Sequence, residues 1–149
     1  MTQEDKELLL KDLCARLPYE VMVREDTVIY DDKNTTNYCV KKFNYGMIGK
    51  GFSRIKGFTH DYEYIYRPYL FPLSSLTEKQ RNEISQLLID TQNTFSPYGE
   101  INTKGCDNLF VCSVKQSNAL IKYCLNNHLD IKGLIEKGLA LDATGLNIY

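Results

Sequence analysis

The sequence predicts a single α+β domain with an N-terminal helix, a curled antiparallel sheet, and later helices packed on one side of that sheet. Three observations indicate this class. Apolar residues recur at helical spacing up to residue 17, a period-two alternation runs from residue 19 to residue 66, and helical spacing returns after residue 77. With 149 residues, of which 43% are hydrophobic and 25% charged, the chain has the length and composition of one globular domain.

The first helix is expected between Thr2 and Pro18. Thr2 is its N-cap and Asp5 follows three residues later, so that each side chain can bond an amide of the first turn. Leu9 and Leu13 lie on its apolar face. Proline disfavours helical backbone in the residue before it, so the helix is expected to end there.

About five short strands are expected to follow. Polar "RED" and "DDKNTTN" are interpreted as turns, and the glycine-rich "NYGMIGKG" as a reversal. Because short loops join the strands, they are expected to be antiparallel neighbours, in a sheet that is either open or closed into a small barrel. The expected strands are residues 19–23, 27–30, 38–45, 51–58 and 62–67.

The stretch "DYEYIYRPYLFPLSSL" contains the last of these strands and a conspicuous run of tyrosines. Period two places alternate side chains on opposite faces of a strand. One face carries Tyr62, Tyr64 and Tyr66, and the other carries Glu63, Ile65 and Arg67. We expect these tyrosines to pack between sheet and helix, with hydroxyls that reach a polar rim.

Capping residues predict three further helices, and a strand is expected at "NLFVCS" before the second of them. Residues 94–108 are expected to form a loop or hairpin. The caps are Thr77 with Gln80, Ser113 with Gln116, and Asp130, which begins the short helix "IKGLIEK" that Gly138 ends.

Three blocks resemble a set of short uncharacterised proteins of Bacteroides-type gut bacteria and of their phages and mobile elements. They are "MTQEDKELLLKDLCARLPYEV", "RPYLFPLSSLTEKQ" and "YCLNNHLDIKGLIEKGLALDA", and together they cover about 55 residues. The resemblance implies an accessory, phage-related origin and a fixed helical frame around a variable β region. It brings no activity and no functional residue.

Chemical signatures for catalysis, metals or cofactors are weak. Five cysteines form no CxxC pair, His60 and His128 stand alone, and "GMIGKGFS" lacks the spacing of a phosphate-binding loop, so neither a metal nor a cofactor is expected. Cys112 with His128 and Asp130 is the one catalytic trio to consider. Cys112 is expected in an apolar strand and His128 at the C-terminus of a helix, positions that favour structural roles, so we expect that the protein is not an enzyme.

A basic segment is the best functional signal. Residues 33–58 carry six bases and no acid, which leaves a net charge of −7 for the rest of the chain. Aromatic residues interleave with these bases over residues 38–58, as they do on sheets that bind single-stranded nucleic acid. The candidate binding residues are Lys41, Lys42, Lys50, Arg54, Lys56, Tyr45 and Phe52.

Two functions remain open. The leading hypothesis is a non-enzymatic interaction or adaptor protein of phage or mobile-element type, whose partner is another protein. The alternative is a nucleic-acid-binding protein that uses the basic aromatic segment, although the net charge of −1 opposes binding to a long polyanion. Apolar runs too short to span a bilayer and an odd number of cysteines predict a cytoplasmic protein without membrane contact.

Overall fold

The computed structural model describes residues 1–30, 35–51, 54–57, 59–90 and 114–149. These divide into two compact units, residues 1–75 with 125–149 and residues 76–124. The first unit contains a mixed sheet with the N-terminal helix, and the second contains two helices. The predicted α+β class is confirmed.

Helix α1 (Gln3–Arg16) begins as predicted. Thr2 Oγ1 accepts from the amide of Asp5 at 3.1 Å, and the Asp5 carboxylate accepts from the amide of Thr2 at 3.0 Å. Backbone and side-chain hydrogen bonds with Thr2 lower the pKa of Asp5. A 3₁₀ turn, η1 (Leu17–Tyr19), follows the helix and contains Pro18.

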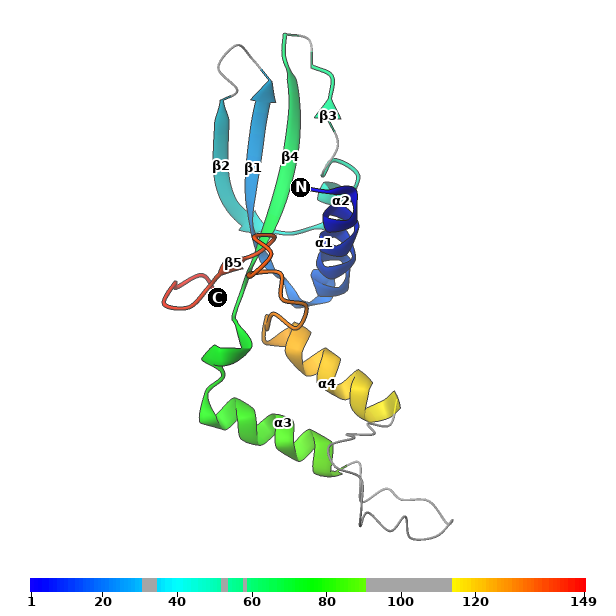
Figure 1. Ribbon diagram of the computed structural model, residues 1–149, viewed down its shortest axis with the longest axis vertical. Coiled ribbons are helices and arrows are strands. Elements are labelled where there is room, and N and C mark those ends of the chain that lie inside the picture. The colour runs from blue at the N-terminus through cyan, green and yellow to red at the C-terminus, as the bar shows by residue number, and fades with distance from the viewer. Residues whose placement is uncertain (31–34, 52–53, 58, 91–113) are drawn as a thin grey trace. The chain divides into compact units, whose positions relative to one another are not determined.

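The sheet has the order β2–β1–β4–β3, and all three of these pairings are antiparallel (Figure 1). Strand β5 pairs in parallel with the end of β4, so the sheet is mixed rather than purely antiparallel. Strands β2 and β3 lie at opposite ends of the order, so the described strands form an open curled sheet and no closed barrel. The bounds are β1 (Met22–Tyr30), β2 (Thr36–Lys42), β3 (Arg54–Ile55), β4 (Asp61–Leu70) and β5 (Leu141–Asp142).

The predicted turn at "RED" is wrong, because Arg24, Glu25 and Asp26 lie within β1. Their charges are accommodated by neighbouring strands. Glu25 pairs with Lys41 of β2 at 2.6 Å, and Asp26 pairs with Arg67 of β4. Cross-strand ion pairs therefore allow a charged triplet to occupy a central strand.

The glycine-rich segment contains a short helix, α2 (Tyr45–Ile48), which the sequence did not predict. Asn44 caps it by accepting from the amide of Gly46 at 3.0 Å. Gly51 then passes so close to the Tyr66 ring that an added Cβ would lie 2.8 Å from it. Of the strand predicted over residues 51–58, the described part retains β3 and a single bridge from Gly51 to Tyr64.

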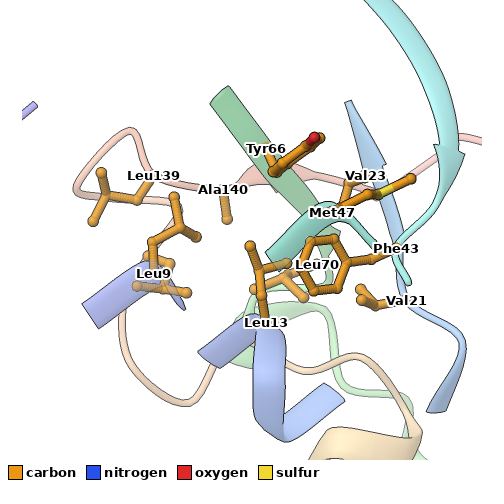
Figure 2. Packing of buried hydrophobic residues seen from close by; sticks show 11 residues of the cluster. Leu9, Leu13, Val21, Val23, Phe43, Met47, Tyr66, Leu70, Leu139 and Ala140 are labelled. Carbon is orange, nitrogen blue, oxygen red and sulfur yellow. The ribbon is translucent and has the colours of Figure 1, made fainter. Parts of the chain in front are cut away.

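One apolar cluster joins α1 to the sheet. Figure 2 shows side chains from α1, β1, β4 and the C-terminal segment pointing toward one another. Phe43 meets the edge of the Tyr66 ring at a centroid distance of 5.7 Å. The fully buried members are Leu9, Leu13, Val21, Val23, Leu70 and Leu134.

The tyrosines of β4 lie on one face, as predicted. Tyr64 contacts Tyr62 edge-on at 5.6 Å and stacks on Tyr66 at 6.5 Å between ring centroids. Tyr66 is buried in the cluster, and Tyr64 packs against it. These side chains therefore belong mainly to the framework of the sheet.

The second unit contains α3 (Glu78–Asp90) and α4 (Val114–Asn126). The predicted capping box of α3 is present, since Gln80 N donates to Thr77 Oγ1 at 3.2 Å and Thr77 N donates to Gln80 Oε1 at 2.9 Å. Tyr123 donates to Glu83 at 2.6 Å, which joins the two helices. The strand at residues 108–113, the loop at 94–108 and the Ser113 cap lie outside the described residues.

The helix predicted after Asp130 is wrong, because residues 131–138 form successive turns. Asp130 caps these turns and accepts from the amides of Leu134 at 2.9 Å and Ile135 at 2.8 Å. Gly133 has φ +63°, a left-handed conformation that interrupts a right-handed helix at its start. Gly138 is left-handed too, with φ +68°, as predicted for a terminating residue.

His128 packs against the C-terminal residue of the chain. Its ring stacks on Tyr149 at 3.9 Å between centroids, and the Tyr149 hydroxyl donates to Tyr69 O at 2.6 Å. Burial, and secondarily the nearby Arg16 charge, lower the pKa of His128 to about 4. The imidazole is therefore neutral in the folded protein at pH values where an unfolded histidine is protonated.

Folding stability is consequently expected to depend on pH through His128. Above pH 6.5 the histidine is neutral in both states, whereas between pH 6.5 and about 4 only the unfolded state gains its proton, so stability falls as the pH falls. Because the ring is partly exposed, we expect a loss of about 1 kcal/mol. His128→Asn, which suits the φ of +53°, should flatten this part of a urea-denaturation pH profile. An unchanged profile would contradict the assignment.

Candidate functional site

The two faces of the sheet carry different side chains. The strand registers pair Arg24 with Val40 and Arg67, and pair Glu25 with Cys39 and Tyr66. Paired residues of neighbouring strands lie on the same face. We call the face with Glu25 and Tyr66 the inner face, because it continues into the apolar cluster. The outer face carries Arg24, Asp26, Tyr38, Val40, Lys42 and Arg67.

Lys41 and Lys42, adjacent in β2, lie on opposite faces. Lys41 Nζ lies 2.6 Å from a carboxylate oxygen of Glu25 on the inner face. Lys42 Nζ lies 2.9 Å from Glu20 at the outer side. The two lysines of the predicted site are therefore separated, and each has an acidic partner.

The remaining predicted residues are spread over other elements. Arg54 in β3 pairs with Asp61 at 3.0 Å, and its guanidinium lies 4.1 Å from the centroid of the Tyr30 ring. Lys50 and Lys56 are exposed, and Tyr45 projects from α2. Phe52 lies outside the described residues. The structure thus divides the basic segment among several surfaces and neutralises three of its bases.

A different cationic cluster lies at the centre of the outer face. Asp26 Oδ2 accepts a hydrogen bond from Arg24 Nη2 at 3.2 Å and also binds Arg67, while Asp26 Oδ1 lies 2.9 Å from Arg24 Nε. Arg24 also lies 5.7 Å from the centroid of the Tyr38 ring. Because Arg24 and Arg67 are direct cross-strand neighbours, the buried Asp26 carboxylate offsets a like-charge contact and leaves one positive charge in excess.

Exposed apolar side chains border this cluster. Tyr38 is 72% exposed and Val40 is 45% exposed, although both lie in a regular strand. Arg24 and Arg67 side chains are about 30% exposed, since Asp26 holds them against the sheet. We call Arg24, Tyr38, Val40 and Arg67 the outer patch.

The inner face carries a buried carboxylate and a small hollow. Burial, and secondarily the Glu25 carboxylate, raise the pKa of Tyr66. A cavity of about 300 Å³ lies further along this face and has no acid or lysine in its lining. The lining residues are Thr27, Ile29, Gly57, Thr59, His60, Tyr62 and Tyr64.

The catalytic trio considered from the sequence is only partly described. Cys112 lies outside the described residues. Both carboxylate oxygens of Asp130 are used by backbone amides, and buried His128 Nδ1 has no hydrogen-bond partner among the described residues. Asp130 therefore acts as a cap and does not orient the imidazole.

Neither a metal site nor a membrane-spanning helix is found among the described residues. No three of their histidine, cysteine, aspartate or glutamate side chains are grouped so that they could hold a metal ion. None of the helices within the same part of the chain has the length and apolar character needed to cross a membrane.

Sequence reasoning missed the outer patch because it treated residues 24–26 as a turn. The available signal was the alternation itself, since Arg24 and Asp26 continue the period of Met22. Arg67 was placed correctly on the face opposite the tyrosines, but its pairing with Asp26, 41 residues away, has no local signal.

The fold and the outer patch define an α+β protein with an open, curled sheet and a cationic, aromatic outer face. No family model, no curated protein and no solved structure matches this chain.

Proposed function

We propose that this protein is a non-enzymatic interaction protein that binds an acidic segment of another protein on the outer patch. The observation that carries the proposal is the sharing of one buried carboxylate by two arginines beside an exposed tyrosine. Arginine and tyrosine are enriched among the residues that contribute most to protein interfaces.

The geometry supports a carboxylate-bearing partner. Asp26 neutralises one of the two guanidiniums, and the excess charge favours an incoming anion. The same carboxylate holds both arginines in place, which reduces the entropy lost on binding. Tyr38 and Val40 supply apolar contact area next to the charge. An extended segment with an acidic residue close to an apolar one would satisfy all four side chains.

Nucleic acid is the second candidate, and the Arg54 contact with the Tyr30 ring favours it, since such pairs can stack with bases. The ion pairs argue against it. Lys41, Lys42 and Arg54 each have an acidic partner, so this sheet offers a polyanion few free cations. A single carboxylate is a better match for one excess charge than a phosphate backbone.

The proposed setting is the cytoplasm, in a phage or mobile-element context. The thiols of Cys14 and Cys39, which form no disulfide with any described residue, are compatible with a reducing compartment. The three sequence blocks that resemble proteins of gut bacteria and their phages support the accessory origin.

The test is a peptide array of random 12-residue segments, probed with the labelled full chain. We expect the wild type to bind preferentially to segments that have Asp or Glu near an apolar residue. In fluorescence anisotropy, Arg24→Ala and Arg67→Ala should each lower the affinity for such a peptide about tenfold. Lys50→Glu with Lys56→Glu is the matched control and should bind like the wild type.

Two outcomes would overturn this proposal. One is an enrichment that ignores acidic residues or survives both arginine substitutions. The other is binding of a labelled single-stranded oligonucleotide at low salt. If this binding is lost as the salt concentration rises and requires Lys50 and Lys56, nucleic acid is the better candidate.

A further inference from the structure

The outer edge of β2 is open among the described residues, because β2 ends the strand order and its other edge pairs with β1. Its side chains are almost all exposed along seven residues. An unpaired edge of this length presents donors and acceptors that can bind another strand.

Hydrogen bonds at both ends of β2 show which residues face that edge. Phe43 N donates to Val21 O at 2.9 Å, and Ile29 N donates to Thr35 O at 2.8 Å. These bonds belong to odd-numbered positions of the segment. In an antiparallel ladder the N–H and C=O groups of alternate residues point the same way. The groups that point away from β1 therefore belong to Thr36, Tyr38, Val40 and Lys42.

Because only the even-numbered residues of β2 have backbone groups that point away from β1, a second copy of β2 can pair with this edge in few ways. In an antiparallel pair related by a two-fold axis, an even-numbered residue must lie opposite an even-numbered residue of the other copy. An axis at Cys39 satisfies this and pairs the strand along its whole length, with every outward group bonded. An axis at Tyr38 or Val40 leaves one end of the strand unpaired.

The side chains agree with the axis at Cys39. Tyr38 would face the partner's Val40, an aromatic and β-branched pair that stabilises antiparallel strands. Lys42 would face the partner's Thr36, and Lys41 would face the partner's Asn37, so no lysine lies directly opposite a lysine. The strand is thus complementary to itself in charge and in apolar side chains.

We propose that the protein forms a two-fold dimer by antiparallel pairing of β2 with β2 of a second copy, centred on Cys39. The two sheets become one continuous sheet. The outer patches of both copies lie on its outer face, near the axis, and stay open for binding. The dimer does not require the proposed function, because it is made by backbone groups and by the contact of Tyr38 with the partner's Val40, and it leaves both arginines free.

In this dimer the two Cys39 residues would be close enough to be joined by a disulfide. Cys39 and the partner's Cys39 would form a non-hydrogen-bonded pair, in which the two Cα atoms lie about 4.5 Å apart. A disulfide can span this distance. Diamide would take two electrons and two protons from the two thiols, forming the S–S bond and the reduced hydrazine. The exposed Cys14 on α1 is an internal control.

The experiment combines light scattering with diamide cross-linking of the full chain. We expect a mass near twice 17.2 kDa and a covalent dimer that is lost in Cys39→Ser but kept in Cys14→Ser. Cys39→Ser should keep the non-covalent dimer. Thr36→Pro removes an outward N–H that β1 does not use, and should weaken the dimer about tenfold or more relative to Thr36→Val.

A monomer at all concentrations, or cross-linking through Cys14 as readily as through Cys39, would overturn the dimer. Thr36→Pro counts only if its circular dichroism matches that of the wild type, and the cysteine variants decide the question if it does not. Loss of the dimer in Thr36→Pro, at a residue outside the outer patch, without loss of acidic-peptide binding would separate this inference from the proposed function.

Discussion

Replacement of Asp12 by alanine should lower the free energy of unfolding by about 3–5 kcal/mol. Asp12 and Arg16 are both 0% exposed, and Arg16 Nε lies 2.6 Å from Asp12 Oδ2. Arg16 also donates to the carbonyl of Leu129 at 2.8 Å, which ties α1 to the C-terminal segment. The substitution leaves a buried guanidinium without its carboxylate, and this uncompensated charge is the source of the loss.

Two further variants separate this effect from a lost contact. Lys132 lies 3.5 Å from Asp12 but is partly exposed, so Lys132→Ala should cost at most about 1 kcal/mol. Asp12→Leu combined with Arg16→Met removes both charges and should recover much of the stability. Urea denaturation gives all three values, and an Asp12→Ala loss below about 1 kcal/mol would contradict a tightly coupled buried pair.

The second large effect is expected at Asp130. Its carboxylate accepts from three backbone amides, those of Lys132 at 3.3 Å, Leu134 at 2.9 Å and Ile135 at 2.8 Å. Alanine would leave these donors without a partner, and the Leu134 amide is buried. Since hydrogen bonds to a charged group contribute more than neutral ones, we expect Asp130→Ala to cost about 2–4 kcal/mol.

Asp142 provides the matched control for Asp130. It accepts from one amide, that of Thr144 at 2.8 Å, in an exposed turn. Asp142→Ala should therefore cost no more than about 1 kcal/mol. Hydrogen exchange should become faster at Leu134 and Ile135 in Asp130→Ala only. Equal losses of stability in the two variants would show that the turns at residues 131–138 do not depend on this cap.

Local signals in the sequence were sufficient for much of the fold. The Thr2 and Thr77 capping boxes are reciprocal contacts over three residues, and period two placed Tyr62, Tyr64 and Tyr66 on one face. Such features depend on neighbours in the chain. The same kind of reasoning could not find β5, because its partner Tyr69 lies 72 residues before Leu141.

Errors arose where a distant contact or a single backbone angle overrides the local pattern. Arg24, Glu25 and Asp26 resemble a turn in isolation, yet partners from β2 and β4 make them central strand residues. The turns after Asp130 contain a helix cap, but left-handed Gly133 interrupts the helix that would follow. In both places the residue types were understood correctly, and the deciding contact or backbone angle was not visible in the pattern.

The candidate site was also predictable from the sequence only in part. Alternation alone implies that Lys41 and Lys42 face opposite sides, so a single basic face was already doubtful from the sequence. Their acidic partners, Glu25 and Glu20, come from another part of the chain, and their proximity has no signature. The outer patch requires the registers of three strands, which only the structure supplies.

A titration of the isotope-labelled full chain with an acidic peptide selected on the array tests most directly whether the outer patch binds protein. The Nε signals of Arg24 and Arg67 and the amide of Tyr38 should shift together with one binding curve, while the amides of Lys50 and Lys56 stay in place. Shifts confined to Lys50, Lys56 and the remainder of the basic segment, with the two arginines unmoved, would contradict binding at this face.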